Sequence, residues 1–289
     1  MAAKSSKDRT TIISPGVSSG IGALAGVIEV ALQQPHVAWK NAVQDNRPVP
    51  WTRPAQLYRG ALVNAGSMAP INAIQFGVDK LLSEALLARG RKVSDAGKIG
   101  VAASAGAVSA LVGCPAELIM IQQQKQGGSL ASQLRQVVQQ HGVTAFAKGL
   151  GPTVIRESIY TGTYLGANPL ICSKLQQLQP GLFADRPVAA MVVASIVSGL
   201  AAAGLTQPVD AIKTKLQANL GNPAYSSVTR TAASMIKERG VLSLWSGLLP
   251  RSLRIIGAVF ILGEAKKRLE AGYLSLTASQ DVTTLKAPL

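Results

Sequence analysis

Charged side chains recur at fixed distances after a proline that ends an apolar stretch. Asp210, Lys213 and Gln217 lie two, five and nine residues after Pro208. These positions are related as i, i+3 and i+7, so the three side chains share one face of a helix. A lone copy of this pattern is typical of a solvated helix face that takes no part in chemistry. Repeated copies instead favour a shared function.

The pattern occurs three times, each with a glycine nine residues before the proline and a glutamine nine residues after it. The copies are Gly26, Pro35 and Gln44; Gly106, Pro115 and Gln124; and Gly199, Pro208 and Gln217. Successive prolines are 80 (115 − 35) and 93 (208 − 115) residues apart. This spacing predicts that the chain is a tandem triplication.

Each copy also carries a second glycine that opens another apolar stretch. The three are Gly60 after Tyr58-Arg59, Gly149 after Phe146-Ala147-Lys148, and Gly247 after Trp245-Ser246. A membrane span needs about 20 apolar residues. The stretches that meet this length are 14–34, 60–82, 97–118, 149–172, 187–207 and 247–265. The sequence therefore predicts an all-α membrane protein with six helices.

Composition agrees with helices in lipid whose inner faces are polar. Hydrophobic residues make up 47% of the 289 residues, charged residues only 15%, and the mean hydropathy is +0.25. The net charge of +15 comes from bases spread along the connectors with few aromatics between them, which argues against nucleic acid and favours anionic lipid. The N-terminus lacks the apolar core of a secretory signal.

No cofactor, metal or enzymatic site is expected from the residue types. Cys114 and Cys172 lie in apolar segments, and His36 and His141 have no partner at ligand spacing, so packing is the better interpretation for all four. The sequence contains no nucleophile–base set and no Gly-rich phosphate loop. We therefore expect a binding or transport function and not an enzyme.

The threefold Pro-x-Asp/Glu-x-x-Lys/Arg signature, with the later aromatic-basic-Gly element, resembles the mitochondrial carrier family. The resemblance covers about residues 14–270. It implies an inner-membrane protein with six transmembrane helices around a pseudo-threefold axis, both termini toward the intermembrane space, and alternating access. The expected repeats are 14–86, 97–178 and 187–271, between an N-terminal tail, 1–13, and a polar C-terminal tail, 272–289.

The resemblance also implies a matrix-side gate of acid–base pairs between neighbouring repeats. Carried over by position, Glu117 pairs with Lys213 and Asp210 with Lys40, and the glutamines Gln44, Gln124 and Gln217 brace the pairs. The third pair would need charges at the positions of Val37 and Met120. Because both residues are apolar, we expect a hydrophobic contact there, which can equal an ion pair when it is well packed.

The connectors differ between the three copies. From the motif proline to the later glycine they span 25 (60 − 35), 34 (149 − 115) and 39 (247 − 208) residues. Residues 226–238 of the third have an apolar side and predict a short matrix helix. Pro48, Pro50 and Pro54 crowd the first connector and block helix continuation. We expect short matrix helices in repeats two and three only.

The glycines that open the second helices are expected lipid sites. Exposed amides at a helix N-terminus attract phosphate, and in the family these positions bind cardiolipin. Gly60 and Gly149 are preceded by the bases Arg59 and Lys148, whereas Gly247 is preceded by Ser246. The alternative is a plain helix start, and the prediction is weaker for the third site because it lacks the charge.

Seven residues after each of these glycines, the family places its substrate contacts. Here the positions are Ser67, Arg156 with Glu157 beside it, and Arg254. Charges at such depth are functional candidates, although an Arg156–Glu157 pair that only holds helices together is the structural alternative. Two guanidiniums bind carboxylates bidentately, so the substrate should carry a carboxylate.

Three functions remain open. Glu29, the Pro70-x-x-Ala73-x-x-Phe76 helix and Pro250-Arg251-x-x-Arg254 are similar to citrate and oxodicarboxylate carriers and favour a small di- or tricarboxylate or oxoacid. An Arg followed by an acid resembles amino-acid carriers instead, with Arg156 and Glu157 binding a zwitterion. The third alternative is a structural or assembly subunit of a larger membrane complex. As a carrier the chain is expected to act as a monomer.

Overall fold

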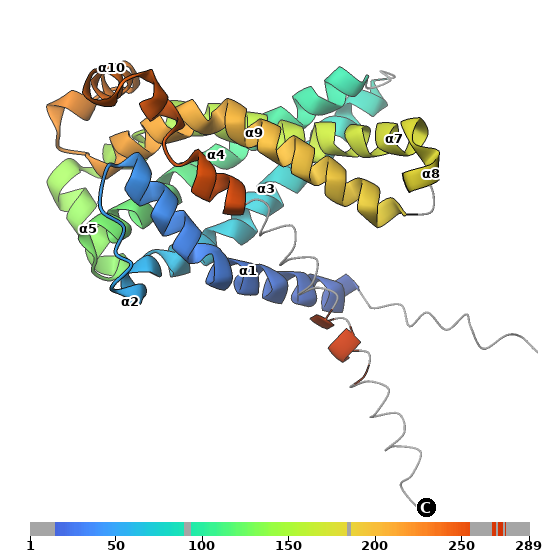
Figure 1. The fold of residues 1–289 in the computed structure, drawn as a ribbon, viewed down its shortest axis with the longest axis horizontal. Coiled ribbons are helices and arrows are strands. Elements are labelled where there is room, and N and C mark those ends of the chain that lie inside the picture. Colours follow the sequence, from blue (N-terminus) through green and yellow to red (C-terminus); the bar gives the residue numbers. More distant parts are fainter. Residues whose placement is uncertain are drawn as a thin grey trace, which may run out of the picture. The chain divides into compact units, whose positions relative to one another are not determined.

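A computed structural model describes residues 15–89, 94–183, 186–254, 268–269, 271–273 and 275, and the structured elements within them are helical. The chain divides into a unit of residues 30–259 and a unit of residues 1–29 and 260–289, and the contacts described here lie within the first. The α-helices are α1 (Pro15–Gln44), α2 (Pro54–Leu57), α3 (Ala61–Ala88), α4 (Asp95–Gln126), α5 (Leu130–His141), α6 (Leu150–Thr161), α7 (Asn168–Leu178), α8 (Pro180–Phe183), α9 (Pro187–Ala218) and α10 (Val228–Arg239) (Figure 1). Short 3₁₀ turns lie at Val143–Ala147, Pro223–Tyr225 and Val241–Trp245.

The three motif prolines lie inside long helices. Pro35, Pro115 and Pro208 are within α1, α4 and α9, which have 30, 32 and 32 residues. These helices run well past the apolar stretches predicted from the sequence, which end at residues 34, 118 and 207. Their polar ends stay helical because the charged and amide side chains after each proline find partners on neighbouring helices.

The connectors follow the predicted inequality. The second contains α5 and the third contains α10, each 12 residues long, whereas α2 in the first has only 4. The hydroxyls of Ser129 and Ser227 cap α5 and α10 by accepting bonds from the amides of Ser132 and Arg230. The structure confirms that the first connector has no helix as long as those of the other two, and its proline-rich composition explains the difference.

Close packing around α4 depends on small residues. α4 contacts both α3 and α6. A Cβ on Gly106 would lie 2.3 Å from the carbonyl oxygen of Glu157, so only glycine allows this approach of α4 to α6. The predicted span 149–172 is not one regular helix, because a π-helical turn at Gly162–Ala167 separates α6 from α7.

Contacts between successive elements close into a ring. α1 meets α3 through the Asn64–Gln34 hydrogen bond of 3.0 Å, and α3, α4, α6 and α9 follow in order. α9 meets helical residues 248–254 through Arg251, and Gly247 packs back onto α1. The polar ends of α1, α4 and α9 come together in this arrangement.

Polar and apolar side chains are distributed as expected for a membrane protein. Leu205 is 70% exposed and Leu111 is 61% exposed, whereas Ser109 and Thr206 are fully buried. Among the described residues, the helices 95–126 and 188–218 are long and apolar enough to cross a membrane. Residues 255–265 of the sixth predicted span, the predicted N-terminal tail, and the predicted C-terminal tail apart from residues 272, 273 and 275 lie outside the described residues.

Candidate functional site

Two buried ion pairs join the polar ends of the three long helices. Nζ of Lys40 in α1 lies 2.9 Å from Oδ2 of Asp210 in α9. Lys213 in α9 pairs with Glu117 in α4. Asp210 is fully buried and Lys213 is 1% exposed. Both pairings implied by the resemblance are confirmed as contacts, while their action as a gate stays a prediction.

The third equivalent position holds apolar side chains. Val37 in α1 and Met120 in α4 are both buried. Burial of two apolar side chains fits the expected replacement of an ion pair by hydrophobic packing. A direct contact between the two stays a prediction.

The same glycine contact occurs in all three copies. Gly60, Gly149 and Gly247 have φ values of +81°, +89° and +82°. A Cβ on these glycines would lie 2.6, 3.2 and 3.4 Å from Cγ of the residue five positions after a motif proline. The pairs are Gly60 with Met120, Gly149 with Lys213, and Gly247 with Lys40. The backbone approach is therefore kept whether the partner is methionine or lysine.

A second threefold contact was not foreseen from the sequence. The residue before each motif proline donates a hydrogen bond to the carbonyl of the residue before each of these glycines. The bonds run from Gln34 Nε2 to Arg59 O (3.1 Å), from Cys114 Sγ to Lys148 O (3.6 Å) and from Gln207 Nε2 to Ser246 O (2.6 Å). The signal available in the sequence was a side-chain donor at the same position of all three copies. These donors satisfy carbonyls at the helix starts.

The three motif glutamines have different partners. Nε2 of Gln44 donates to Oδ2 of Asp210 at 2.9 Å, so Gln44 braces an ion pair as expected. Gln124 instead accepts a bond from Asn41 at 2.6 Å, and Gln217 donates to the carbonyl of Lys148 at 3.1 Å. The prediction that these two glutamines brace ion pairs is therefore wrong. Gln124 has no charged partner because position 120 is methionine, and the amide of Gln217 is bound to a carbonyl at a helix start.

Arg156 lies within the ionic layer. Its Nη2 is 2.8 Å from Oε1 of Glu117, and its Nη1 is 3.4 Å from Oδ1 of Asp210. It also pairs with Glu157, whose other oxygen accepts a 3.3 Å bond from Gln75. The Arg156–Glu157 pair that the sequence allowed is present, and the guanidinium additionally bridges the acids of the two motif pairs.

Arg251 also reaches the ionic layer, although Arg254 was the residue predicted from the sequence. Nη2 of Arg251 donates to Oγ1 of Thr206 at 2.7 Å, and Nη1 lies 3.8 Å from Oδ2 of Asp210. Arg251 is one turn after Gly247, which puts it nearer the motif residues than Arg254. We define the gate cluster as Lys40, Glu117, Arg156, Glu157, Asp210, Lys213 and Arg251. Its four cations and three carboxylates leave one positive charge (4 − 3).

Two predicted substrate contacts lie outside the gate cluster. Ser67 is half-buried in α3, and its hydroxyl donates to the carbonyl of Asn64 at 3.1 Å. Arg254 is half-buried in helical residues 248–254. Of the predicted contacts, the structure brings Arg156 and Glu157 together.

The residues at the three predicted lipid positions have different surroundings. Nζ of Lys148 donates to the carbonyl of Leu220 at 2.8 Å, and burial lowers the pKa of this lysine. The guanidinium of Arg59 lies against Gly127. Gly247 borders a cavity of about 560 Å³ whose other walls are mostly apolar: Trp39, Val43, Trp245, Leu248, Leu249, Pro250 and Ser252. The position at Gly247, which no basic residue precedes, is thus the one that borders this mostly apolar cavity.

The outward apolar faces, the inward polar faces and the buried ionic layer define a helical membrane protein. The family described as mitochondrial carrier protein matches residues 92–177 and 184–269, more than half of the chain. The chain therefore belongs to the mitochondrial carrier family, whose members are transporters of the mitochondrial inner membrane.

Individual relatives are similar to the chain at low identity. The mitochondrial 2-oxoglutarate/malate carrier protein of Caenorhabditis elegans is 24% identical over 79% of this chain and 78% of its own. The tricarboxylate transporter FUM11 of Gibberella moniliformis is 27% identical over 84% and 85%. The mitochondrial arginine transporter BAC2 of Arabidopsis thaliana is 27% identical over 87% and 90%.

Proposed function

We propose that this chain exchanges a small carboxylate-bearing metabolite, a di- or tricarboxylate or oxoacid, across the mitochondrial inner membrane by alternating access. The observation that carries the proposal is the gate cluster, in which buried ion pairs join helices from all three copies and one positive charge is in excess. Relatives named as 2-oxoglutarate/malate and tricarboxylate carriers support this substrate class.

The proposed architecture is six transmembrane helices in three repeats, 14–86, 97–178 and 187–271, around a pseudo-threefold axis. The equivalent contacts of Gly60, Gly149 and Gly247 support it, because three copies of one unit related by a rotation repeat each contact between neighbours. The ring of contacts from α1 to residue 254 supports it as well.

In the proposed mechanism, the ion pairs Lys40–Asp210 and Glu117–Lys213 close the matrix side. Arg156 couples the substrate to this gate, because its guanidinium is bound to Glu117 and Asp210. A substrate carboxylate that binds Arg156 competes with both acids for the same donors. Withdrawing Arg156 weakens both pairs, so the gate opens when the substrate is bound.

Lipid binding is proposed at the three helix-start glycines, with cardiolipin as the ligand. Each glycine precedes a helix N-terminus, where amide groups without a partner inside the helix attract phosphate, and the cavity beside Gly247 offers an apolar wall for an acyl chain. The carrier is proposed to work as a monomer.

The test is exchange of labelled 2-oxoglutarate, malate or citrate by the purified protein in liposomes. Arg156→Ala and Arg254→Ala should each reduce exchange at least about 100-fold, because charge-assisted contacts to the substrate are lost. Arg135→Ala, an exposed position in α5, is the matched control and should retain exchange. Full exchange in both test variants would overturn the assigned site.

A second candidate is transport of an amino acid, which the Arg156–Glu157 pair favours because the two side chains present opposite charges to a zwitterion. The similarity to an arginine transporter points the same way. Glu157→Gln with Arg156 intact should abolish uptake of an amino acid and spare a dicarboxylate. Absence of any exchange, together with co-purification in fixed ratio with a larger complex, would favour the structural-subunit alternative.

A further inference from the structure

A second ionic cluster lies at the ends of the same helices and contains a single carboxylate. Asp45 is 4% exposed, and its carboxylate accepts bonds from Nε of Arg47 at 2.7 Å and Nδ2 of Asn219 at 2.6 Å. The Nζ atoms of Lys125 and Lys215 each lie 3.8 Å from it. We call these five residues the Asp45 cluster. None of them was singled out by the sequence argument.

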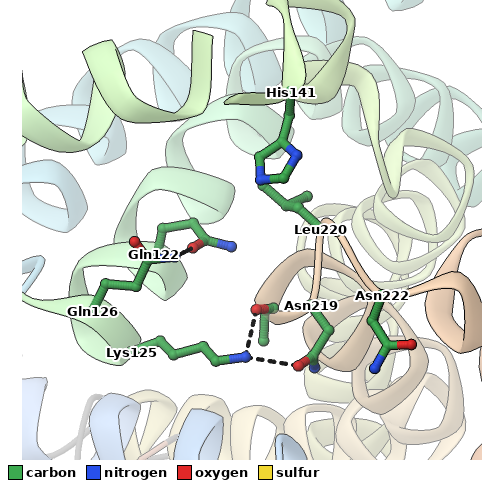
Figure 2. A pocket seen from close by; sticks show the side chains of 9 residues that line it. Gln122, Lys125, Gln126, His141, Asn219, Leu220 and Asn222 are labelled. Carbon is green, nitrogen blue, oxygen red and sulfur yellow. Dashed lines mark hydrogen bonds between the residues drawn. The ribbon is translucent and has the colours of Figure 1, made fainter. Parts of the chain in front are cut away.

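The Asp45 cluster ties together the ends of α1, α4 and α9. Asp45 directly follows α1, while Lys125 and Lys215 lie in the last turns of α4 and α9. Lys215 also donates to the carbonyl of Asp45 at 2.9 Å. Lys125 donates to the carbonyl of Ala218 at 2.8 Å and to Oδ1 of Asn219 at 2.7 Å. Figure 2 shows the bond from Lys125 to Asn219.

This cluster restores an ionic contact between the two copies that lack one in the gate. Val37 in the first copy and Met120 in the second stand at positions where the equivalent residues are charged, Glu117 and Asp210 for the one and Lys40 and Lys213 for the other. Asp45 lies eight residues (45 − 37) beyond Val37, about two helical turns toward the helix ends. There its carboxylate meets Lys125 of the second copy.

We propose that Asp45 is a positioning residue for transport, which holds the three helix ends together in the matrix-closed state in place of the missing gate pair. The proposal rests on the proposed function as a carrier. Three cations surround one buried carboxylate, so loss of the negative charge leaves Arg47, Lys125 and Lys215 to repel one another. The helix ends then separate more easily.

The geometry also allows the contact to be released during the transport cycle. Lys125 borders a cavity of about 290 Å³ between α4, α5 and the segment after α9, with His141 and Asn222 on its other sides (Figure 2). The ammonium can move into this polar hollow without entering an apolar environment. An ionic contact whose cation can move into a polar cavity when the helix ends separate suits a gate.

The decisive variant is Asp45→Asn, measured in liposomes with labelled 2-oxoglutarate or citrate, whichever the wild type exchanges. A weakened matrix closure lowers the fraction of carrier that faces the outer side. The KM for outside substrate should therefore rise about threefold to tenfold, with kcat per folded protein changed less. Damage to the fold alone lowers the amount of active protein and leaves KM where it was.

Rescue separates this function from a general structural one. Val37→Asp combined with Met120→Lys adds the acid–base pair that the other two gate positions have. Gly60 already packs against position 120 as Gly149 packs against Lys213, so a lysine stem fits there. In the Asp45→Asn background the added pair should return KM to within about twofold of wild type.

Asp95→Asn is the matched control, because Asp95 forms an exposed pair with Lys98 at the start of α4. An unchanged KM in Asp45→Asn, or a raised KM that the added pair does not restore, would overturn the proposal. If the wild type shows no exchange, the proposed function fails. The melting temperatures of the same proteins in detergent then still decide whether the added pair compensates for Asp45.

Discussion

The three equivalent glycine contacts share one backbone geometry, but the motif residues beside them differ in chemistry. Lys40–Asp210 and Glu117–Lys213 are ionic, whereas Val37 and Met120 are apolar. In all three, a glycine with positive φ packs against the residue five positions after a motif proline. Close approach of the helices is therefore set by glycine. Ion pairs are an additional interaction, which is absent at the positions of Val37 and Met120.

The first and second copies are joined by polar contacts at other positions. The interface of the first and second copies has polar contacts nearer the helix ends, from Asn41 to Gln124 and from Asp45 to Lys125. Removing only one partner of a buried ion pair is destabilising, because the remaining unpaired charge costs several kcal/mol. An interface in which both partners are apolar, with an ionic contact elsewhere, carries no such unpaired charge.

The largest effect is expected from Asp210→Asn. Asp210 faces Lys40, Gln44, Arg156 and Arg251, so its neutralisation leaves several buried cations without their common anion. The free energy of unfolding should fall by about 3–5 kcal/mol, seen as a lower melting temperature of detergent-purified protein. Asp95→Asn, on the exposed face of α4, should change it by less than about 1 kcal/mol. Equal effects of the two variants would show that the ionic interfaces add no stability.

The threefold spacing predicted the helices, and the resemblance to the mitochondrial carrier family, carried over position by position, implied the two ion pairs. Neither could predict the contacts that join positions outside this spacing. Arg156 meets Asp210 across 54 residues of sequence, and Asp45 meets Asn219 across 174. The sequence favoured Arg254 over Arg251 as a contact, although the two lie one helical turn apart and Arg251 is the one that reaches the gate cluster. Such choices depend on helix rotation and packing, which a repeat pattern leaves undetermined.

A smaller effect tests whether glycine sets the helix approach. Gly60→Ala places a Cβ 2.6 Å from Cγ and 3.2 Å from Cα of Met120. Gly149→Ala has the same left-handed backbone, φ +89° and ψ 10°, but its Cβ would come no closer than 3.2 Å to a neighbour, Cγ of Lys213. Both variants suffer the backbone strain of a left-handed alanine, about 1–2 kcal/mol. Gly60→Ala should lose about 1–3 kcal/mol more through overpacking, measured by thermal unfolding. If both lose the same stability, the closer contact at Gly60 does not limit the interface.

The smallest expected effect compares two buried amides on α1. Gln44 donates to the carboxylate of Asp210, whereas Asn41 donates to the neutral amide of Gln124, at 2.9 and 2.6 Å. Hydrogen bonds to charged groups contribute about 1.5–3 kcal/mol and neutral ones about 1 kcal/mol. Gln44→Leu should therefore lower the melting temperature more than Asn41→Leu, although the neutral bond is the shorter one. The reverse order would mean that distance outweighs charge in this layer, and that the polar contacts of the first and second copies hold the helix ends as firmly as the ionic ones.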